Sequence, residues 1–399
     1  MTTTSIAAAA SAIAAATRFR AVPLAALALF AALTPARLDA SGCCAGTGNF
    51  GLDARWSGDT ASEPEEERIV NILNAATTTT RGLYAEINKV FGEAWVKKTR
   101  YSLAINGAHG PAFAHTRSIA TGQSDADIVT LDNPAAIDDL ARAGLLPAGW
   151  RARLPNDSVP FSTTLVFLVR KGNPKGIRDW ADLSRPGVRA VLPDPRESSI
   201  GQWVWLAAWA LALERADGDS GKARDDVLAL YRNAVAVYPS ANGATGAFIR
   251  RKTIDVLPIL ESEALARTAV GELPAGDYDI ITPPASLRVE TPVAWLDANV
   301  KKHETERVSA SLLMYLFTPV AQEIAARHYF RPTDAAVAQK NASRFSPVRL
   351  LTLAGAFGGW DAARQRFFGP GSELERDYQA LISGAPAQSA RPPSAKPVD

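Results

Sequence analysis

The stretch that decides the fold reads RAVLPDPRESSIGQWVWLAAWALALERA, residues 189–216. It starts with a short apolar run at 189–193, continues through a polar turn, and then becomes apolar over about five helical turns. A short apolar run, a turn and a longer apolar segment are typical of a strand–loop–helix unit in an α/β protein. We therefore predict a strand at 189–193 and a helix at 200–216.

The same order of strand, polar loop and helix recurs on both sides of this unit. Further strands are predicted at 68–76, 101–106, 126–131, 163–172 and 234–238, and further helices at 82–98, 112–121, 134–144 and from about 246. Strands that alternate with helices of this length predict α/β architecture with mainly parallel sheets.

The loops between these elements carry the predicted chemistry, because ligands of open α/β sheets bind beyond the carboxyl ends of the strands. The loops are rich in Gly, Ser and Thr, and they lie at 77–80, 107–110, 194–198 and 240–243. Backbone N–H groups and hydroxyls at helix starts can bind an anion without a cationic side chain. Ser and Thr before helices are also ordinary caps, and Ser199 with Gln202 resembles a capping box.

Length and composition limit the class of protein. The 399 residues allow two or three domains, and 47% hydrophobic with 21% charged residues is the balance of a globular chain. A net charge of +2 gives no basic excess for nucleic acid. Two cysteines and four histidines argue against a disulfide scaffold and a Cys- or His-based metal site. We expect no metal, no cofactor and no nucleic-acid partner.

Residues 1–40 show the pattern of a secretory signal peptide. Arg18 and Arg20 precede a 13-residue apolar stretch at 21–33, and small residues follow it. The stretch is shorter than the roughly 20 residues that span a bilayer. Its removal takes away three Arg and one Asp, which leaves 40 basic and 40 acidic residues and no net charge. We expect an exported protein.

Both cysteines, Cys43 and Cys44, lie directly after this segment. The residues from Ala40 to Cys43 resemble a lipoprotein cleavage box, in which Cys43 would carry the lipid, whereas Arg37 and Asp39 argue against one. The Gly-, Ser- and acid-rich residues 41–67 predict a linker, and the low-complexity residues 384–399 predict a disordered tail.

Five long segments carry a family resemblance: PFSTTLVFLVRKGNPK (160–175), ADIVTL (126–131), LAAWALAL (206–213), EIAARHYFRPTD (323–334) and AFGGW (356–360). Over about residues 68–368 the chain resembles the periplasmic sulfate/thiosulfate-binding proteins of ABC importers. The resemblance implies a type II periplasmic-binding-protein fold, in which two α/β lobes close over an anion in a hinged cleft.

The family pattern also implies how the chain is divided and what it does. It places lobe 1 at 68–158 and 265–335, lobe 2 at 159–264, and C-terminal helices at 336–383, with hinge strands near 159–168 and 257–263. The implied function is capture of sulfate, thiosulfate or a related oxyanion in the periplasm and its delivery to the permease subunits of an ABC importer.

The resemblance assigns ligand-binding positions one by one. Ser198 matches a serine of the family, and Ala241 matches a backbone donor. The other implied positions depart from the pattern: Thr78 replaces Asp, Ala112 replaces Ser, Leu260 replaces Trp, and Ser199 and Ile200 stand where the family has two glycines.

These departures leave the ligand open. Sulfate carries no proton at neutral pH, so a site made only of donors suits it. Each donor lost to a buried charged ligand costs roughly 1.5–3 kcal/mol, and threonines 77–80 offer hydroxyls that can replace those lost. The alternatives are a binding protein of the same fold that has switched to an organosulfonate or another small solute, or a non-transport sensor.

Enzyme motifs are missing or out of context, so we predict no catalytic residue. The GDSG at 218–221 lies in a charged stretch that predicts a solvated turn, and no G-x-S-x-G elbow occurs. His303 and Glu304 are not part of an H-E-x-x-H pair. Glu261 and Glu263 are interpreted as structural or surface groups. His109 either contacts the ligand or only packs in its loop.

Overall fold

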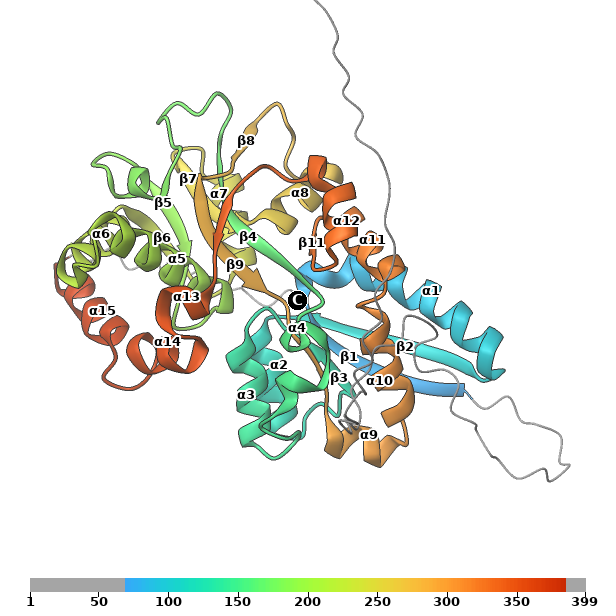
Figure 1. The fold of residues 1–399 in the computed structure, drawn as a ribbon. Coiled ribbons are helices and arrows are strands. Elements are labelled where there is room, and N and C mark those ends of the chain that lie inside the picture. The colour runs from blue at the N-terminus through green and yellow to red at the C-terminus, as the bar shows by residue number, and fades with distance from the viewer. Residues whose placement is uncertain (1–68, 385–399) are drawn as a thin grey trace, which may run out of the picture. The chain divides into compact units, whose positions relative to one another are not determined.

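The structure, a computed structural model, describes residues 69–384, which form two β-sheets with helices around them (Figure 1). The signal peptide expected at 1–40, the linker expected at 41–67 and the lipidation site Cys43 lie outside the described residues. The tail expected at 384–399 lies outside them as well, apart from Gly384, which ends helix α15 (Glu373–Gly384).

The smaller sheet has the strand order β10-β3-β1-β2. Its strands are β1 (Ile69–Thr77), β2 (Ser102–Gly110), β3 (Ile128–Thr130) and β10 (Val293–Trp295). Successive side chains of a strand point to opposite faces, so Ile72 packs with helices α1, α10 and α11, whereas Ala75 packs with α2 and α3. Because both faces are covered, these strands are apolar without a simple alternation.

The larger sheet has the order β12-β9-β4-β7-β5-β6, and β8 and β11 pair with β4. Its strands are β4 (Phe161–Arg170), β5 (Ala190–Pro193), β6 (Ala234–Tyr238), β7 (Val256–Leu260), β8 (Tyr278–Ile281), β9 (Ala285–Glu290), β11 (Arg331–Pro332) and β12 (Arg349–Leu351). Leu165 and Phe167 of β4 pack with α5, and Val166 and Leu168 pack with α7.

The helices lie mostly where the sequence predicts them. They are α1 (Arg81–Thr99), α2 (Ala112–Ala120), α3 (Pro134–Arg142), α4 (Pro155–Ser158), α5 (Ser199–Arg215), α6 (Ser220–Arg232), α7 (Ala241–Arg250), α8 (Glu261–Ala269), α9 (Asp297–His303), α10 (Glu306–Tyr315), α11 (Pro319–Arg327), α12 (Ala335–Lys340), α13 (Leu353–Phe357), α14 (Trp360–Phe367) and α15. Short 3₁₀ turns occur at η1 (Thr78–Thr80), η2 (Trp150–Arg153), η3 (Trp180–Ser184) and η4 (Ala342–Arg344).

The expectation of mainly parallel sheets is only half right. The smaller sheet is parallel except for β10, but in the larger sheet β4 is antiparallel to β7, β8, β9 and β11. Strands β8 and β9, which the sequence assigns to the first lobe, hydrogen-bond to β4 in the larger sheet, and the chain enters the smaller sheet again at β10. A strand that links two sheets does not follow the strand–helix alternation, so its pairing cannot be predicted from that pattern.

Two predicted loops are parts of regular elements. The strand expected at 101–106 continues to Gly110 because residues 107–110 pair with the end of β1. The helix expected from about 246 begins at Ala241, so the predicted loop at 240–243 forms its first turn. The GDSG at 218–221 is the expected turn between two helices, where Asp219 caps α6.

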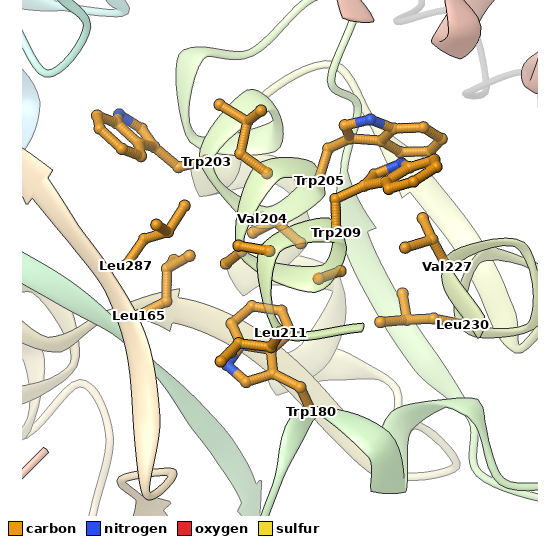
Figure 2. Close-up of a cluster of buried hydrophobic side chains, with 14 of the residues drawn as sticks. Leu165, Trp180, Trp203, Val204, Trp205, Trp209, Leu211, Val227, Leu230 and Leu287 are labelled. Carbon is orange, nitrogen blue, oxygen red and sulfur yellow. The ribbon is translucent and has the colours of Figure 1, made fainter. Parts of the chain in front are cut away.

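Helix α5 is buried along most of its length (Figure 2). A helix that is apolar all round belongs in a core rather than at a surface. Figure 2 shows Trp203 on one side of the helix and Trp205 with Trp209 on another. The Trp203 ring meets the ring of Trp360 edge-on at 4.9 Å, and Trp205 meets Tyr231 at 5.0 Å. Helix α5 is therefore packed on several sides at once.

Two hydrogen bonds connect the start of α5 to the loop after β3. Trp203 Nε1 donates to the carbonyl oxygen of Asp132 at 2.6 Å, and Asn133 Nδ2 donates to Gln202 Oε1 at 2.9 Å. All four residues are buried. These bonds join the larger sheet's longest buried helix to the smaller sheet.

Between residues 69 and 384 no single helix is long and apolar enough to cross a membrane. Helices α10 and α11 meet the length and composition criteria only as a pair that bends by 67°. Both carry buried side chains in the core of the smaller sheet.

We predict that Trp203→Phe destabilises the protein by about 1–3 kcal/mol more than Trp205→Phe does. Both indoles are fully buried in α5, but only Trp203 donates a hydrogen bond, whereas the Trp205 N–H has no partner among the described residues. The Trp203 change leaves the buried Asp132 carbonyl without its donor, and an unpaired buried group costs about 1–3 kcal/mol. Urea unfolding measures both variants. Equal losses would contradict the importance of the Trp203 bond.

Candidate functional site

The carboxyl ends of six strands surround a cavity of about 60 Å³. Its lining residues follow β1, β2 and β3 of the smaller sheet and β5, β6 and β7 of the larger sheet: Thr78, Thr79, Gly110, Pro111, Phe113, Asp132, Glu197, Ser198, Ser199, Ile200, Pro239, Ser240, Ala241, Asn242 and Glu263. A water needs roughly 10–15 Å³ on this kind of measure, so the cavity has room for a few waters or one small polyatomic ion. It lies where the α/β architecture predicts a ligand site.

Helices α2, α5 and α7 all begin at the cavity, and η1 leads into α1 beside them. The first N–H groups of a helix have no partner within the helix. At the cavity these groups belong to Ala112 and Phe113 of α2, Ser199 and Ile200 of α5, and Ala241 and Asn242 of α7. Aligned N–H groups with the positive end of the helix dipole favour an anion.

The caps of α5 and α7 leave their hydroxyl protons available. Ser198 Oγ accepts a hydrogen bond from Gly201 N at 3.3 Å, and Ser240 Oγ accepts one from Gly243 N at 3.1 Å. A serine hydroxyl that accepts such a bond can still donate its own proton. The capping box predicted from Ser199 and Gln202 is wrong, since the cap is Ser198 and the Gln202 side chain is bonded to Asn133.

Five of the seven residues predicted to bind ligand line the cavity: Thr78, Ser198, Ser199, Ile200 and Ala241. The structure brings them together from β1, β5 and β6, which are far apart in the sequence. Ile200 is nearly buried and adds an apolar wall. The cavity is thus lined by the loops that the strand–helix pattern selects.

Ala112 and Leu260 are placed differently from the other five. The methyl group of Ala112 is fully buried in a core cluster, and Ala112 itself does not line the cavity, although its neighbours Pro111 and Phe113 do. Leu260 ends β7 opposite Leu165, and its side chain is buried in the core of the larger sheet. It is not among the residues that line the cavity.

The threonines at 77–80 divide into two that line the cavity and two that hold the loop. Thr80 Oγ1 donates to the carbonyl of Thr77 at 2.8 Å, and Thr77 Oγ1 lies 3.3 Å from Thr79 Oγ1. Thr78 and Thr79 line the cavity. Of these four threonines, Thr78 and Thr79 are therefore the two that lie at the cavity.

Three carboxylates line the cavity, and the sequence predicted none of them as ligand contacts. Asp132 and Glu263 are each 7% exposed, and Glu197 is exposed. Among the lining residues there is no Lys, Arg or His. A weak signal for one of them was present, since Asp132 directly follows the strand predicted at 126–131.

Asp132 has an unusual environment for an ionised group. Its Oδ1 is buried and has no hydrogen-bond partner among the described residues. The pKa of Asp132 is raised to about 6, mainly by burial. The negative charge of Glu263 also raises this pKa, whereas a hydrogen bond from Ser199 lowers it. A buried carboxylate with one oxygen that has no partner is costly to ionise, so the protonated form is favoured up to weakly acidic pH.

Glu263 is buried as well, but it has a partner. Burial raises the pKa of Glu263, whereas the charge of Arg267 and its hydrogen bond at 2.9 Å lower it. Arg267 also donates to Asn242 Oδ1 at 2.6 Å, and Asn242 belongs to the first turn of α7. Arg267 thus ties α8 to the start of α7 without lining the cavity.

His109 and His115 lie beside the cavity and bond to the end of β1. His109 Nδ1 is 3.4 Å from the carbonyl oxygen of Thr77, and His115 Nε2 is 3.1 Å from that of Ala76. A carbonyl only accepts, so each of these ring nitrogens carries the proton. Burial lowers the pKa of both rings. Of the two roles considered for His109, the structure therefore favours packing in its loop.

The remaining groups considered for catalysis have structural partners. Glu261 is buried and makes two hydrogen bonds to Arg331, at 2.7 and 2.8 Å. His303 bonds to Asp127 at 2.9 Å. Within residues 69–384 no group of three or more His, Cys, Asp or Glu side chains is placed to hold a metal ion.

Gly201 sets the position of the α5 start. A Cβ at this position would lie 2.4 Å from the backbone oxygen of Asp194 and 2.7 Å from the nitrogen of Pro195. The first turn of α5 therefore packs directly on the turn after β5, which Asp194 and Arg196 brace with bonds of 2.6 and 3.1 Å. Close backbone approach of this kind requires glycine.

The fold and the cavity define a class of protein: a type II periplasmic-binding-protein fold with one small polar site at the strand ends of two α/β sheets. Residues 72–331 match the family described as bacterial extracellular solute-binding protein. The chain belongs to this family, which confirms the resemblance found in the sequence.

Several similar proteins are named for the anion that they bind. The chain is 39% identical over 307 residues to the sulfate-binding protein of Escherichia coli (strain K12), covering 77% of this chain and 92% of that one. It is 34% identical over 310 residues to the thiosulfate-binding protein of Pseudomonas aeruginosa, with the same coverage of 77% and 92%. Among solved structures, the sulfate-binding protein SubI from Mycobacterium tuberculosis H37Rv matches with a TM-score of 0.66 and 28% identity, over 76% of this chain and 100% of that chain. All three are named as binding proteins.

We predict that Gly201→Ala destabilises the protein, because its Cβ would collide with backbone atoms that cannot rotate away. The matched control is Gly92→Ala in α1, where nothing lies within 4 Å of the new Cβ. In a helix interior this control should stabilise by roughly 0.5–1 kcal/mol. Thermal and urea unfolding of both variants give the comparison. A stabilising effect at Gly201 would show that the α5 start is not fixed by this contact.

We predict that Asp132→Asn stabilises the protein more at pH 8 than at pH 4. The pKa of Asp132 is raised from 3.8 to about 6 in the folded state. The folded chain therefore holds a proton that the unfolded chain releases, and stability falls as pH rises through this window. The full loss is about 3 kcal/mol at most. Asn does not titrate, so its advantage should appear above pH 6 in urea unfolding. An advantage that does not change with pH would contradict the raised pKa.

Proposed function

We propose that the protein is the extracytoplasmic solute-binding component of an ABC importer and that it captures sulfate, thiosulfate or a related oxyanion in the cavity. The observation that carries this proposal is the meeting of three helix N-termini and the η1 turn at one small polar cavity. Each helix start offers N–H groups without an internal partner, and together they form an anion site without cationic side chains.

The chemistry of the lining supports a small oxyanion. Backbone N–H groups and the hydroxyls of Thr78, Ser198 and Ser240 are donors that can surround tetrahedral oxygens. The cavity of about 60 Å³ suits a small ion rather than a polymer. The names of the relatives from E. coli and P. aeruginosa support sulfate and thiosulfate as the first ligands to test.

The seven predicted residues have different proposed roles. We assign direct contacts to Thr78, Ser198, Ser199, Ile200 and Ala241, the last two through backbone N–H groups. Ala112 contributes its N–H group only, and Leu260 supports the site from the core. The alternatives of a switched organic ligand or a non-transport sensor lack an observation of their own, and no catalytic role is assigned.

The transport cycle we propose needs no chemistry in this chain. Strands β4 and β9 lie where the chain passes between the two sheets, so we place the hinge there, where bending would open and close the cavity. The second hinge segment expected at 257–263 belongs instead to β7 and the start of α8, and β7 pairs with β4 within the larger sheet. The two lobes would close on the anion, and the closed form would dock on the permease subunits. Export to the periplasm by the signal peptide at 1–40, with or without a lipid on Cys43, completes this proposal.

Isothermal titration with sulfate, thiosulfate and an organosulfonate tests the function directly. We predict binding of at least one inorganic oxyanion by the wild-type protein, and an affinity 10- to 100-fold weaker for Ser198→Ala. The hydroxyl of Ser198 caps α5 and can still donate to the ligand, and a lost donor to a charged ligand costs roughly 1.5–3 kcal/mol.

The control for this variant is Thr318→Ala. Thr318 caps α11 with a bond to Ala321 N at 3.4 Å and does not line the cavity, so its loss changes stability without changing affinity. Stabilisation by an organic solute together with no binding of any inorganic oxyanion would refute the proposed function. If only the Ser198→Ala result fails, with the affinity unchanged, the ligand binds away from the start of α5.

A further inference from the structure

The cavity combines two features that conflict for a fully ionised anion. Its backbone donors favour negative charge, but its charged side chains are all acidic. Glu263 is neutralised in part by Arg267, and the side chain of Glu197 is exposed. Asp132 is the exception, since it is 7% exposed and its Oδ1 has no partner among the described residues. An ionised Asp132 would face a bound anion at short range across a region of low dielectric constant, which is strongly unfavourable.

The position of Asp132 is fixed by the fold. Its carbonyl oxygen accepts from Trp203 Nε1, and the next residue, Asn133, caps α3 through a bond to Ala135 N at 2.9 Å and bonds to Gln202. The main chain on both sides of the carboxyl is therefore held by buried bonds. A shift of the Asp132 main chain away from the cavity would break contacts of α5, so a change in protonation is the smaller adjustment that the site can make.

We propose that an oxyanion is bound in this cavity together with one proton, shared between the Asp132 carboxyl and a ligand oxygen. This inference rests on the proposed function, and it names the ligand chemistry of the same site. The proton has two sources. With a fully ionised dianion such as sulfate, Asp132 takes up the proton and donates it to the ligand as an O–H···O⁻ bond. With a hydrogen oxyanion, the ligand brings the proton and the Asp132 carboxylate accepts it.

Both cases give Oδ1 the partner that it lacks. A proton between two oxygens changes a repulsive contact into a charge-assisted hydrogen bond, which is shorter and stronger than a neutral one. The other titratable groups around Asp132 support the same direction. Glu263 on α8 raises the pKa of Asp132, and Glu197 adds a further carboxylate to the lining. The rings of His109 and His115 bond to main-chain carbonyls and do not line the cavity.

The test measures sulfate affinity and proton uptake between pH 5 and pH 8 by calorimetry in buffers of different ionisation enthalpy. Sulfate does not titrate in this range, so any proton taken up enters the protein. With the pKa of Asp132 near 6, the protonated fraction falls about 100-fold by pH 8, and affinity should fall with it. Wild-type protein should take up close to one proton per sulfate at pH 8.

Asp132→Asn replaces the carboxyl by a permanent N–H donor of the same shape. We expect this variant to bind sulfate without proton uptake, with an affinity that does not depend on Asp132 titration and that exceeds the wild-type affinity at pH 8. Asp125→Asn is the control, since it removes an exposed carboxylate that does not line the cavity while Asp132 stays. It should keep the proton uptake and the pH dependence.

Inorganic phosphate distinguishes the two sources of the proton. Binding of hydrogen phosphate at pH 8 that is tighter than sulfate binding in wild type, and no longer tighter in Asp132→Asn, shows that the ligand brings the proton. Sulfate binding with proton uptake and no phosphate binding shows that Asp132 provides the site of protonation. Either result supports shared-proton binding.

The outcomes that overturn the inference differ from those that overturn the function. Sulfate affinity that is flat with pH in wild type, or proton uptake that persists in Asp132→Asn, would refute the shared proton and leave the anion-binding function intact. No binding of any oxyanion by either protein at any pH would refute the proposed function itself, and the shared proton with it.

Discussion

The hydrogen bond from Trp203 to the Asp132 carbonyl is the contact on which the site depends. Helix α5 is packed by the core on several sides, so its start has little freedom to move. The bond extends this rigidity to the loop after β3, which belongs to the other sheet. Gly201 adds a second constraint by pressing the first turn of α5 on the turn after β5. The donors of α5 and the carboxyl of Asp132 are thus fixed relative to one another.

Much of the fold follows from local pattern. The strand–loop–helix units at 69–99 and 190–215 were predictable, because a buried parallel strand and the helix that covers it follow each other directly in the sequence. The pairing of β4 was not predictable in this way. It pairs with β7, β8, β9 and β11, and all four of these partners are more than 85 residues away in sequence. Apolar sequence says that a strand is buried but not which strands lie beside it.

The candidate site shows the same division. The loops that contain Ser198 and Ala241 were predictable because segments after a strand and before a helix lie at the sheet edge where ligands bind, and the family resemblance selected these two residues within them. Asp132 and Glu263 were missed because the same positions also suit a cap or a surface ion pair, and only the packing of α5 and α8 buries them. Leu260, selected by the resemblance, has its side chain in the core instead of the cavity lining, because strand alternation turns it that way.

Side-chain charge is a poor guide to what this cavity binds. The lining is acidic, and the chain without its first 40 residues carries no net charge, so long-range attraction cannot draw in an anion. Binding must instead depend on hydrogen-bond donors in direct contact, which act within a few ångströms, well inside the Debye length of about 10 Å at 0.1 M salt. For binding by direct contacts, one acceptor in the lining affects the affinity for an anion more than the net charge of the chain does. An ionised Asp132 repels a bound anion and competes with it for the surrounding donors. A protonated Asp132 is itself a donor, so the protonation state of this one carboxyl decides whether every group at the helix starts favours the anion.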